Sequence, residues 1–102
     1  MRKLEESKIP TGSKSISITV TDTITELELG IPWISFSLLN DGPSSVYAEV
    51  NNRGKLLDGV PILSGEPYNY DAQYPVIRVL YLQAVSGGTA SVRIKGKEGR
   101  RQ

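Results

Sequence analysis

Apolar and polar residues alternate along most of this chain. In residues 15–21 every second position is Ile or Val, and the positions between them are Ser or Thr. A period of two also runs through residues 34–38, 46–50 and 90–94. Successive side chains of a strand point to opposite faces, so each segment predicts a strand with one buried face and one polar face.

Other apolar segments are less regular. Residues 76–84 form the longest apolar run, with apolar side chains at both odd and even positions, which predicts a central strand. Residues 24–29 fit a short strand or a crossover, and residues 60–63 and 66–70 each fit a brief strand. The pattern therefore predicts seven or eight short strands.

Turn-forming residues separate these segments. Asn40-Asp41-Gly42-Pro43 follows residues 34–38, and Asp and Gly tolerate the positive φ of a tight turn whereas Pro43 cannot continue a paired ladder. We therefore expect residues 34–38 and 46–50 to form a β-hairpin. Ser86-Gly87-Gly88-Thr89 predicts a second hairpin turn before the last strand.

Many short strands with frequent turns indicate an all-β fold. The prediction is a single antiparallel β-sandwich, jelly-roll or Ig-like, over residues 14–96. Residues 1–13 are expected to form an extended N-terminal arm, partly disordered unless assembled, and residues 97–102 a basic C-terminal tail.

The composition restricts the chemistry that this chain can perform. Its 102 residues include no Cys and no His, which excludes the usual zinc sites, a Cys nucleophile, a Ser-His pair and disulfides. Glu26 and Glu28 fit a solvated strand face better than a pair of catalytic carboxyl groups. We expect no enzymatic activity, no metal and no cofactor.

Charge is divided unevenly along the chain. The net charge is +2 in residues 1–14, −5 in residues 15–92 and +4 in residues 93–102. Basic ends either keep frayed termini soluble or dock on an acidic surface, such as the body of a neighbouring copy. Nucleic acid is disfavoured as a partner because the C-terminal tail has no aromatic side chain. The basic candidate interaction residues are Arg2, Lys3, Lys95, Lys97, Arg100 and Arg101.

Four aromatic residues are further candidates for an interaction surface. Tyr68, Tyr70 and Tyr74 cluster within seven residues, and in an extended chain the first two point to the same side. Exposed tyrosines would form a sugar-stacking platform or an oligomer contact, whereas buried tyrosines are packing residues. Trp33 has the same two interpretations, as an anchor of the core or of a neighbour.

The sequence contains no pattern that predicts membrane association. Its first ten residues include Glu5 and Glu6, where a signal peptide has an apolar stretch. The longest mixed apolar region, residues 31–39, is interrupted by Pro32 and is far shorter than the roughly 20 residues that span a bilayer. We expect a cytosol-like compartment or an assembled particle, and no membrane partner.

From Trp33 onward, turn and strand motifs follow one another in a fixed order. They are Asn40-Asp41-Gly42-Pro43, residues 46–51, Ser64-Gly65-Glu66, residues 76–82, Gly87-Gly88-Thr89-Ala90 and residues 92–96. This order resembles a small β-sandwich module of tailed-bacteriophage virion proteins, over about two-thirds of the chain. The resemblance implies a structural role in a virus particle, as a capsid decoration, head-fibre or tail component. It also implies homo-oligomers, other virion proteins as partners, and a location in the virion and in the host cytoplasm during assembly.

Three functional hypotheses remain open at this point. The first is a structural or accessory protein of a bacteriophage virion that acts through protein–protein contacts and self-association. The second is a carbohydrate-binding module whose exposed tyrosines bind a glycan for host-surface attachment. The third is a phage-encoded regulator directed at a host protein.

Overall fold

A computed structural model describes residues 13–71 and 76–99. These residues form six strands and one short 3₁₀ helix, so the all-β prediction is confirmed. The elements are β1 (Ser13–Thr21), β2 (Thr25–Pro43), β3 (Val46–Val50), η1 (Arg53–Asp58), β4 (Pro67–Asp71), β5 (Ile77–Ala84) and β6 (Thr89–Glu98).

All strand pairs are antiparallel and belong to one sheet of order β1-β6-β2-β5-β3, with β4 also paired to β2. The long β2 strand connects two parts of this sheet. Its first half pairs with β5, and its second half lies between β6 and β4. The pairing with β5 shifts register between Glu28 and Trp33, a stretch that includes Gly30 and Pro32.

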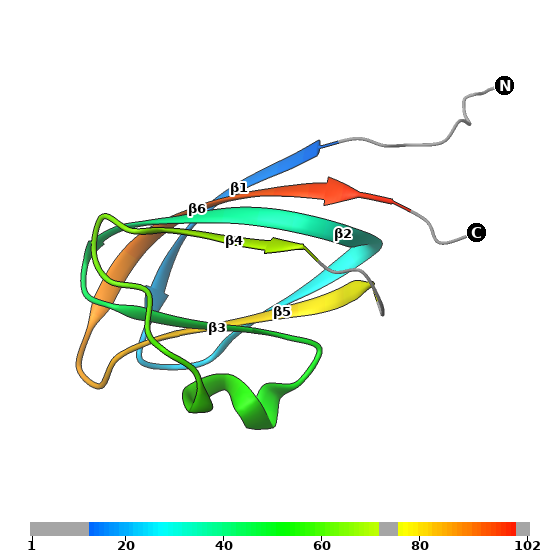
Figure 1. Cartoon of the computed structure of the whole chain (residues 1–102). Helices are drawn as coiled ribbons and strands as arrows, with labels where there is room; N and C mark the ends of the chain where they lie inside the picture. Colours follow the sequence, from blue (N-terminus) through cyan, green and yellow to red (C-terminus); the bar gives the residue numbers. More distant parts are fainter. Residues whose placement is uncertain (1–12, 72–75, 100–102) are drawn as a thin grey trace, which may run out of the picture.

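The sheet folds over at this bend into two layers (Figure 1). One layer contains β1, β6, the second half of β2, and β4; the other contains the first half of β2, β5 and β3. Because β2 belongs to both layers, the hydrogen bonding is continuous. The two separately bonded sheets of a sandwich are therefore not confirmed.

The strand boundaries differ from the predicted ones in three places. The segments at residues 24–29 and 34–38 are parts of the single strand β2. Residues 60–63 contribute only an isolated bridge between Ile62 and Val46. β6 continues to Glu98, so Lys97 belongs to the sheet and not to a tail.

Both predicted hairpins are wrong. β3 pairs with β5 and not with β2, and β6 pairs with β1 and β2 and not with β5. Each turn instead carries the chain from one layer to the other. The second half of β2 has β6 on one edge and β4 on the other, which leaves no edge for β3.

Asn40 holds the crossover from β2 to β3. Its side chain is fully buried, and its amide nitrogen donates to the carbonyl oxygens of Ser44 (2.8 Å) and Ile62 (2.9 Å). Its Oδ1 accepts a hydrogen bond from the backbone N–H of Gly42 at 2.7 Å. A buried polar group that satisfies all these partners fixes the path of the chain between layers.

The core lies between the two layers and is formed by the inward side chains of the strands. Trp33 and Phe36 of β2 are buried in it, with ring centroids 6.3 Å apart. Gly96 of β6 lies beneath the indole of Trp33, where a Cβ atom would overlap the ring. The other buried members of the cluster are Val20, Leu38, Val46, Ile62, Ile77, Leu80, Leu82, Ala84, Ala90, Val92 and Ile94.

Candidate interaction surface

β6 presents a stripe of basic side chains on the outside of the molecule. Buried and exposed residues alternate along the whole strand. The inward positions are apolar or glycine from Ala90 to Gly96, so the odd-numbered residues must face solvent. Arg93, Lys95 and Lys97 therefore point outward together, at intervals of about 7 Å along the strand.

Hydroxyl side chains lie on both sides of this stripe. On β1, Ser13, Ser15 and Ser17 are the direct partners of Lys97, Lys95 and Arg93. On β2, Ser35 is opposite Lys97 and Ser37 is opposite Lys95. Directly opposite residues of paired strands share a face. We call this surface the β6 face, and define it as Ser13, Ser15, Ser17, Ser35, Ser37, Asn69, Asp71, Arg93, Lys95 and Lys97.

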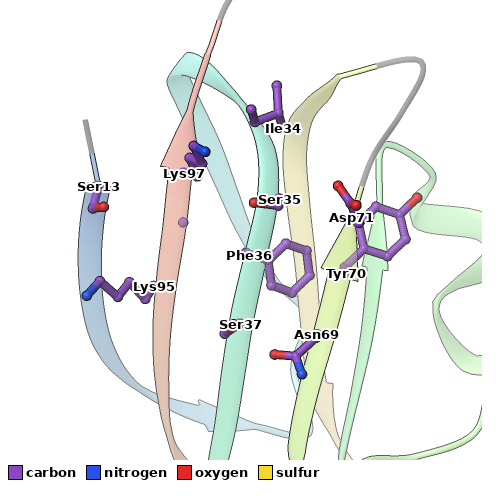
Figure 2. A pocket seen from close by; sticks show the side chains of 11 residues that line it. Ser13, Ile34, Ser35, Phe36, Ser37, Asn69, Tyr70, Asp71, Lys95 and Lys97 are labelled. Carbon is purple, nitrogen blue, oxygen red and sulfur yellow. The ribbon is translucent and has the colours of Figure 1, made fainter. Parts of the chain in front are cut away.

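β4 adds an amide and a carboxylate at the margin of the β6 face. Asn69 pairs with Ser37, and Asp71 pairs with Ser35. Lys95, Lys97 and these β4 residues line an open depression of about 600 Å³ across β1, β6, β2 and β4 (Figure 2). A basic side and an acidic margin thus border the same depression.

Arg93 is held by an ion pair with Asp41 at the other end of the stripe. Arg93 Nε lies 2.8 Å from Asp41 Oδ2, and Arg93 Nη2 lies 3.0 Å from Oδ1, a two-pronged arrangement. The hydrogen bonds that Asp41 accepts, and then its negative charge, raise the pKa of Arg93 above its ordinary value. Both side chains are well exposed, so the pair orients Arg93 more than it stabilises the fold.

The chemistry of the β6 face suits contact with an anionic surface. Ammonium groups and hydroxyls donate hydrogen bonds to carboxylates or phosphates, and the exposed stripe is open to a large partner. Residues 13–71 and 76–99 contain no group of three or more His, Cys, Asp or Glu residues positioned to hold a metal ion.

Tyr68 and Tyr70 face the core side of β4. Both are half-buried, and both pack on Phe36, with ring centroids 6.1 Å and 5.6 Å away. Burial, and then the charges of Tyr70 and Glu49, raise the pKa of the Tyr68 hydroxyl. The two tyrosines point to the same side of the strand, as predicted, and their rings pack between the layers.

Trp33 is a core residue and is not available as a surface anchor. Only 1% of its side chain is exposed, and its indole covers Gly96. The inward parity of Trp33 on β2 follows from its pairing with the buried residues Ile77 and Glu98. Of its two interpretations from the sequence, the surface anchor is therefore wrong.

Five of the candidate interaction residues lie outside the described residues. These are Arg2, Lys3, Tyr74, Arg100 and Arg101. The two candidates that the structure places on an exposed surface are Lys95 and Lys97.

Two features of the surface were not predicted from the sequence. The serines of β1 and β2 flank the lysines only because distant segments pair, and no local pattern specifies that pairing. Leu57, Val60 and Leu63 are exposed, Val60 to 90%, and their apolar character alone favoured burial. Exposed apolar side chains at three sites of one short segment are a second possible contact region.

Comparisons with protein-family models, with curated proteins and with solved structures gave no match. Within the described residues, no helix is both long enough and apolar enough to cross a membrane.

Proposed function

We propose that this protein is a non-enzymatic structural or accessory protein of a bacteriophage virion. In this proposal it is a capsid decoration, head or tail component that acts through protein–protein contacts and self-association. It belongs to the virion, and to the host cytoplasm during assembly. The resemblance of its motifs to virion β-modules supports a location in a virus particle. The β6 face supports a role in contacts between proteins.

The observation that carries the proposal is the β6 face. Sites for small molecules are mostly enclosed and apolar, with few polar groups. The β6 face is instead an open sheet surface on which a row of basic side chains on β6 lies between rows of serines on β1 and β2. Such a surface fits the polar, complementary contact between two macromolecules.

Carbohydrate binding through the tyrosines has less support. A stacking platform presents the face of an aromatic ring to solvent. Tyr68 and Tyr70 are half-buried and pack on Phe36. Tyr74, the third member of the cluster, lies outside the described residues.

The test reverses the charge of the β6 face and measures incorporation into particles. We expect the double variant Lys95→Glu, Lys97→Glu to fold normally, since both side chains are exposed, and to be incorporated about tenfold less than the wild type. The matched control, Arg53→Glu, Lys55→Glu, makes the same change in charge on exposed η1 residues and should be incorporated normally. Equal incorporation of both double variants would count against the β6 face as the contact surface.

A further inference from the structure

β1 is the outermost strand of its layer, and its pairing with β6 is unbroken. All nine residues from Ser13 to Thr21 have partners on β6, without a register shift. β1 ends the strand order, so within the described part of the chain no strand lies along its second edge. The backbone groups along such an edge are a template for another strand.

The other sheet edges are shorter or interrupted. β3 and β4 have five residues each; β4 begins with Pro67, and β3 is bridged to Ile62. The first half of β2 pairs only with β5, and its other edge is interrupted by Pro32. Prolines, bulges and short lengths are the usual protection of an exposed edge. β1 has no proline and no bulge, and its side chains alternate regularly.

The segment from Lys14 to Asp22 is a palindrome in residue type, centred on Ile18. Positions at equal distances from the centre carry hydroxyl, apolar, hydroxyl and charged side chains, in that order. The matched pairs are Ser17 and Thr19, Ile16 and Val20, Ser15 and Thr21, and Lys14 and Asp22.

We propose that β1 pairs antiparallel with β1 of a second copy of this chain, around a two-fold axis at Ile18. In this register every apolar residue lies opposite an apolar residue and every hydroxyl opposite a hydroxyl. Lys14 lies opposite the partner's Asp22, and this contact occurs twice because of the symmetry. Lys14 and Asp22 are both exposed in the single chain. Asp22 lies one residue beyond the end of β1, and its Oδ2 accepts a hydrogen bond from the backbone N–H of Gly87 at 2.9 Å; a carboxylate can accept further bonds.

The charges select this arrangement over its competitors. A parallel pair in register would place Lys14 beside the partner's Lys14, and Asp22 beside the partner's Asp22. Sliding the antiparallel pair by two residues keeps apolar residues opposite each other but separates the charges. Sliding it by one residue places apolar residues opposite hydroxyls.

A groove beside β1 adds a reason for a second copy to cover this edge. The groove has a volume of about 520 Å³ and lies between β1 and the first half of β2, with Ile16, Leu29 and Ile31 among its lining residues. Ile31 is 37% exposed and Ile16 is half-buried. A strand added to β1 would close the mouth of this groove and remove apolar surface from water.

This inference deepens the proposed function and rests on it for its biological setting, since it names the partner and the strand of the self-association. The two proposals can fail separately. A β1 dimer that is absent from particles would overturn the virion function alone. A monomer that is present in particles would overturn the β1 pairing alone.

Disulfide cross-linking of the full chain tests the register directly, because the wild type has no cysteine. In the proposed dimer, Ile18→Cys thiols lie opposite each other with Cα atoms about 4.5–5.5 Å apart, within disulfide range. The matched control on the same strand is Ser15→Cys, which lies opposite the partner's Thr21. Its two copies would be about 20 Å apart, at six residues along the strand.

We expect the wild type to be a dimer by light scattering, Ile18→Cys to form a covalent dimer, and Ser15→Cys to form little. A wild-type monomer at every concentration, or equal cross-linking of the two cysteine variants, would overturn the proposal.

Ile18 is half-buried, so its replacement by Cys could also affect folding. A charge variant at the exposed Lys14 tests the same dimer without changing Ile18. Lys14→Glu replaces attraction by repulsion at both ends of the pair, and we expect it to raise the dimer dissociation constant about tenfold. Lys55→Glu, an exposed residue of η1, makes the same change away from β1 and should leave the constant unchanged. Equal constants for these two variants would also overturn the proposal.

Discussion

Gly96 shows how one residue sets the packing of the core. It lies on β6 at an inward position, directly beneath the indole of Trp33. Its φ angle is not in the left-handed region, so the requirement for glycine comes from space and not from backbone conformation. The largest side chain of the core and the smallest residue of the chain are therefore matched across two paired strands.

Replacing Gly96 by alanine should lower the free energy of unfolding by about 1–3 kcal/mol, because the added methyl group overlaps the indole and forces Trp33 to move. Urea denaturation monitored by the fluorescence of this single Trp would measure the change. Gly59→Ala is the matched control, since no atom lies within 4 Å of its added Cβ. Equal stabilities of the two variants would contradict the packing of Trp33 on Gly96.

The asparagines show why residue type alone was a weak guide to role. Asn40 and Asn51 both occur in turn-rich sequence, where Asn is expected for its conformational freedom. Asn51 does adopt a positive φ of 59°, but its Oδ1 also accepts hydrogen bonds from the N–H groups of Arg78 and Val79. Ile62, which accepts from Asn40, and both residues that donate to Asn51 lie more than twenty residues away, so a local pattern cannot reveal these partners.

At the scale of elements, the strands were predictable and their pairing was not. Alternation located β1, β3 and β6, and a continuous apolar run located β5. In the described residues, no two consecutive strands pair with each other. Turn residues specify where the chain reverses, but they do not specify whether the next strand joins the same layer.

The residues of the β6 face were likewise predictable where a local pattern determines them and not where strand pairing does. The parity of Lys95 and Lys97 on β6 can be derived from the apolar residues between them. The flanking serines could not be assigned to the same surface, since β1 and β2 reach β6 only through long-range pairing. The sequence left two roles open for Trp33, in the core or in a contact with a neighbour. A strand with one polar and one apolar face does not show what covers its apolar face.

Tyr68 of β4 is expected to make the stability of the fold depend on pH in the alkaline range. Burial, followed by the charges of Tyr70 and Glu49, raises the pKa of Tyr68 in the folded state above the unfolded value of about 10. Below that value the hydroxyl is protonated in both states, and its contribution to stability is fully present. As the pH rises above it, the unfolded chain loses its proton first, so this contribution is lost up to the folded pKa.

Tyr68→Phe should therefore lose less unfolding free energy than the wild type when the pH is raised from about 9 to about 11. Urea denaturation at a series of pH values would measure both curves, and the comparison removes the titrations that the two proteins share. The same variant at neutral pH serves as the control for lost packing, since the ring on Phe36 is retained. Parallel curves throughout this range would contradict a raised pKa of Tyr68 in the folded state.

At the scale of the whole molecule, the division of charge along the sequence is not the division in space. Arg93, Lys95 and Lys97 belong to a central strand of one layer and not to a tail. Glu26 and Glu28 are exposed on the first half of β2, which belongs to the other layer. The basic stripe and the two glutamates thus lie on different layers, although Asp41 and Asp71 lie beside the basic stripe on its own layer.

The copy number of this protein in purified particles tests the central claim most directly. Quantitative mass spectrometry of gradient-purified virions would compare it with the major capsid protein. A structural or decorating subunit that self-associates should be present in many copies per particle, in a fixed ratio that persists through repeated purification. Detection only in the lysate of infected cells, with none in the purified particles, would contradict the claim.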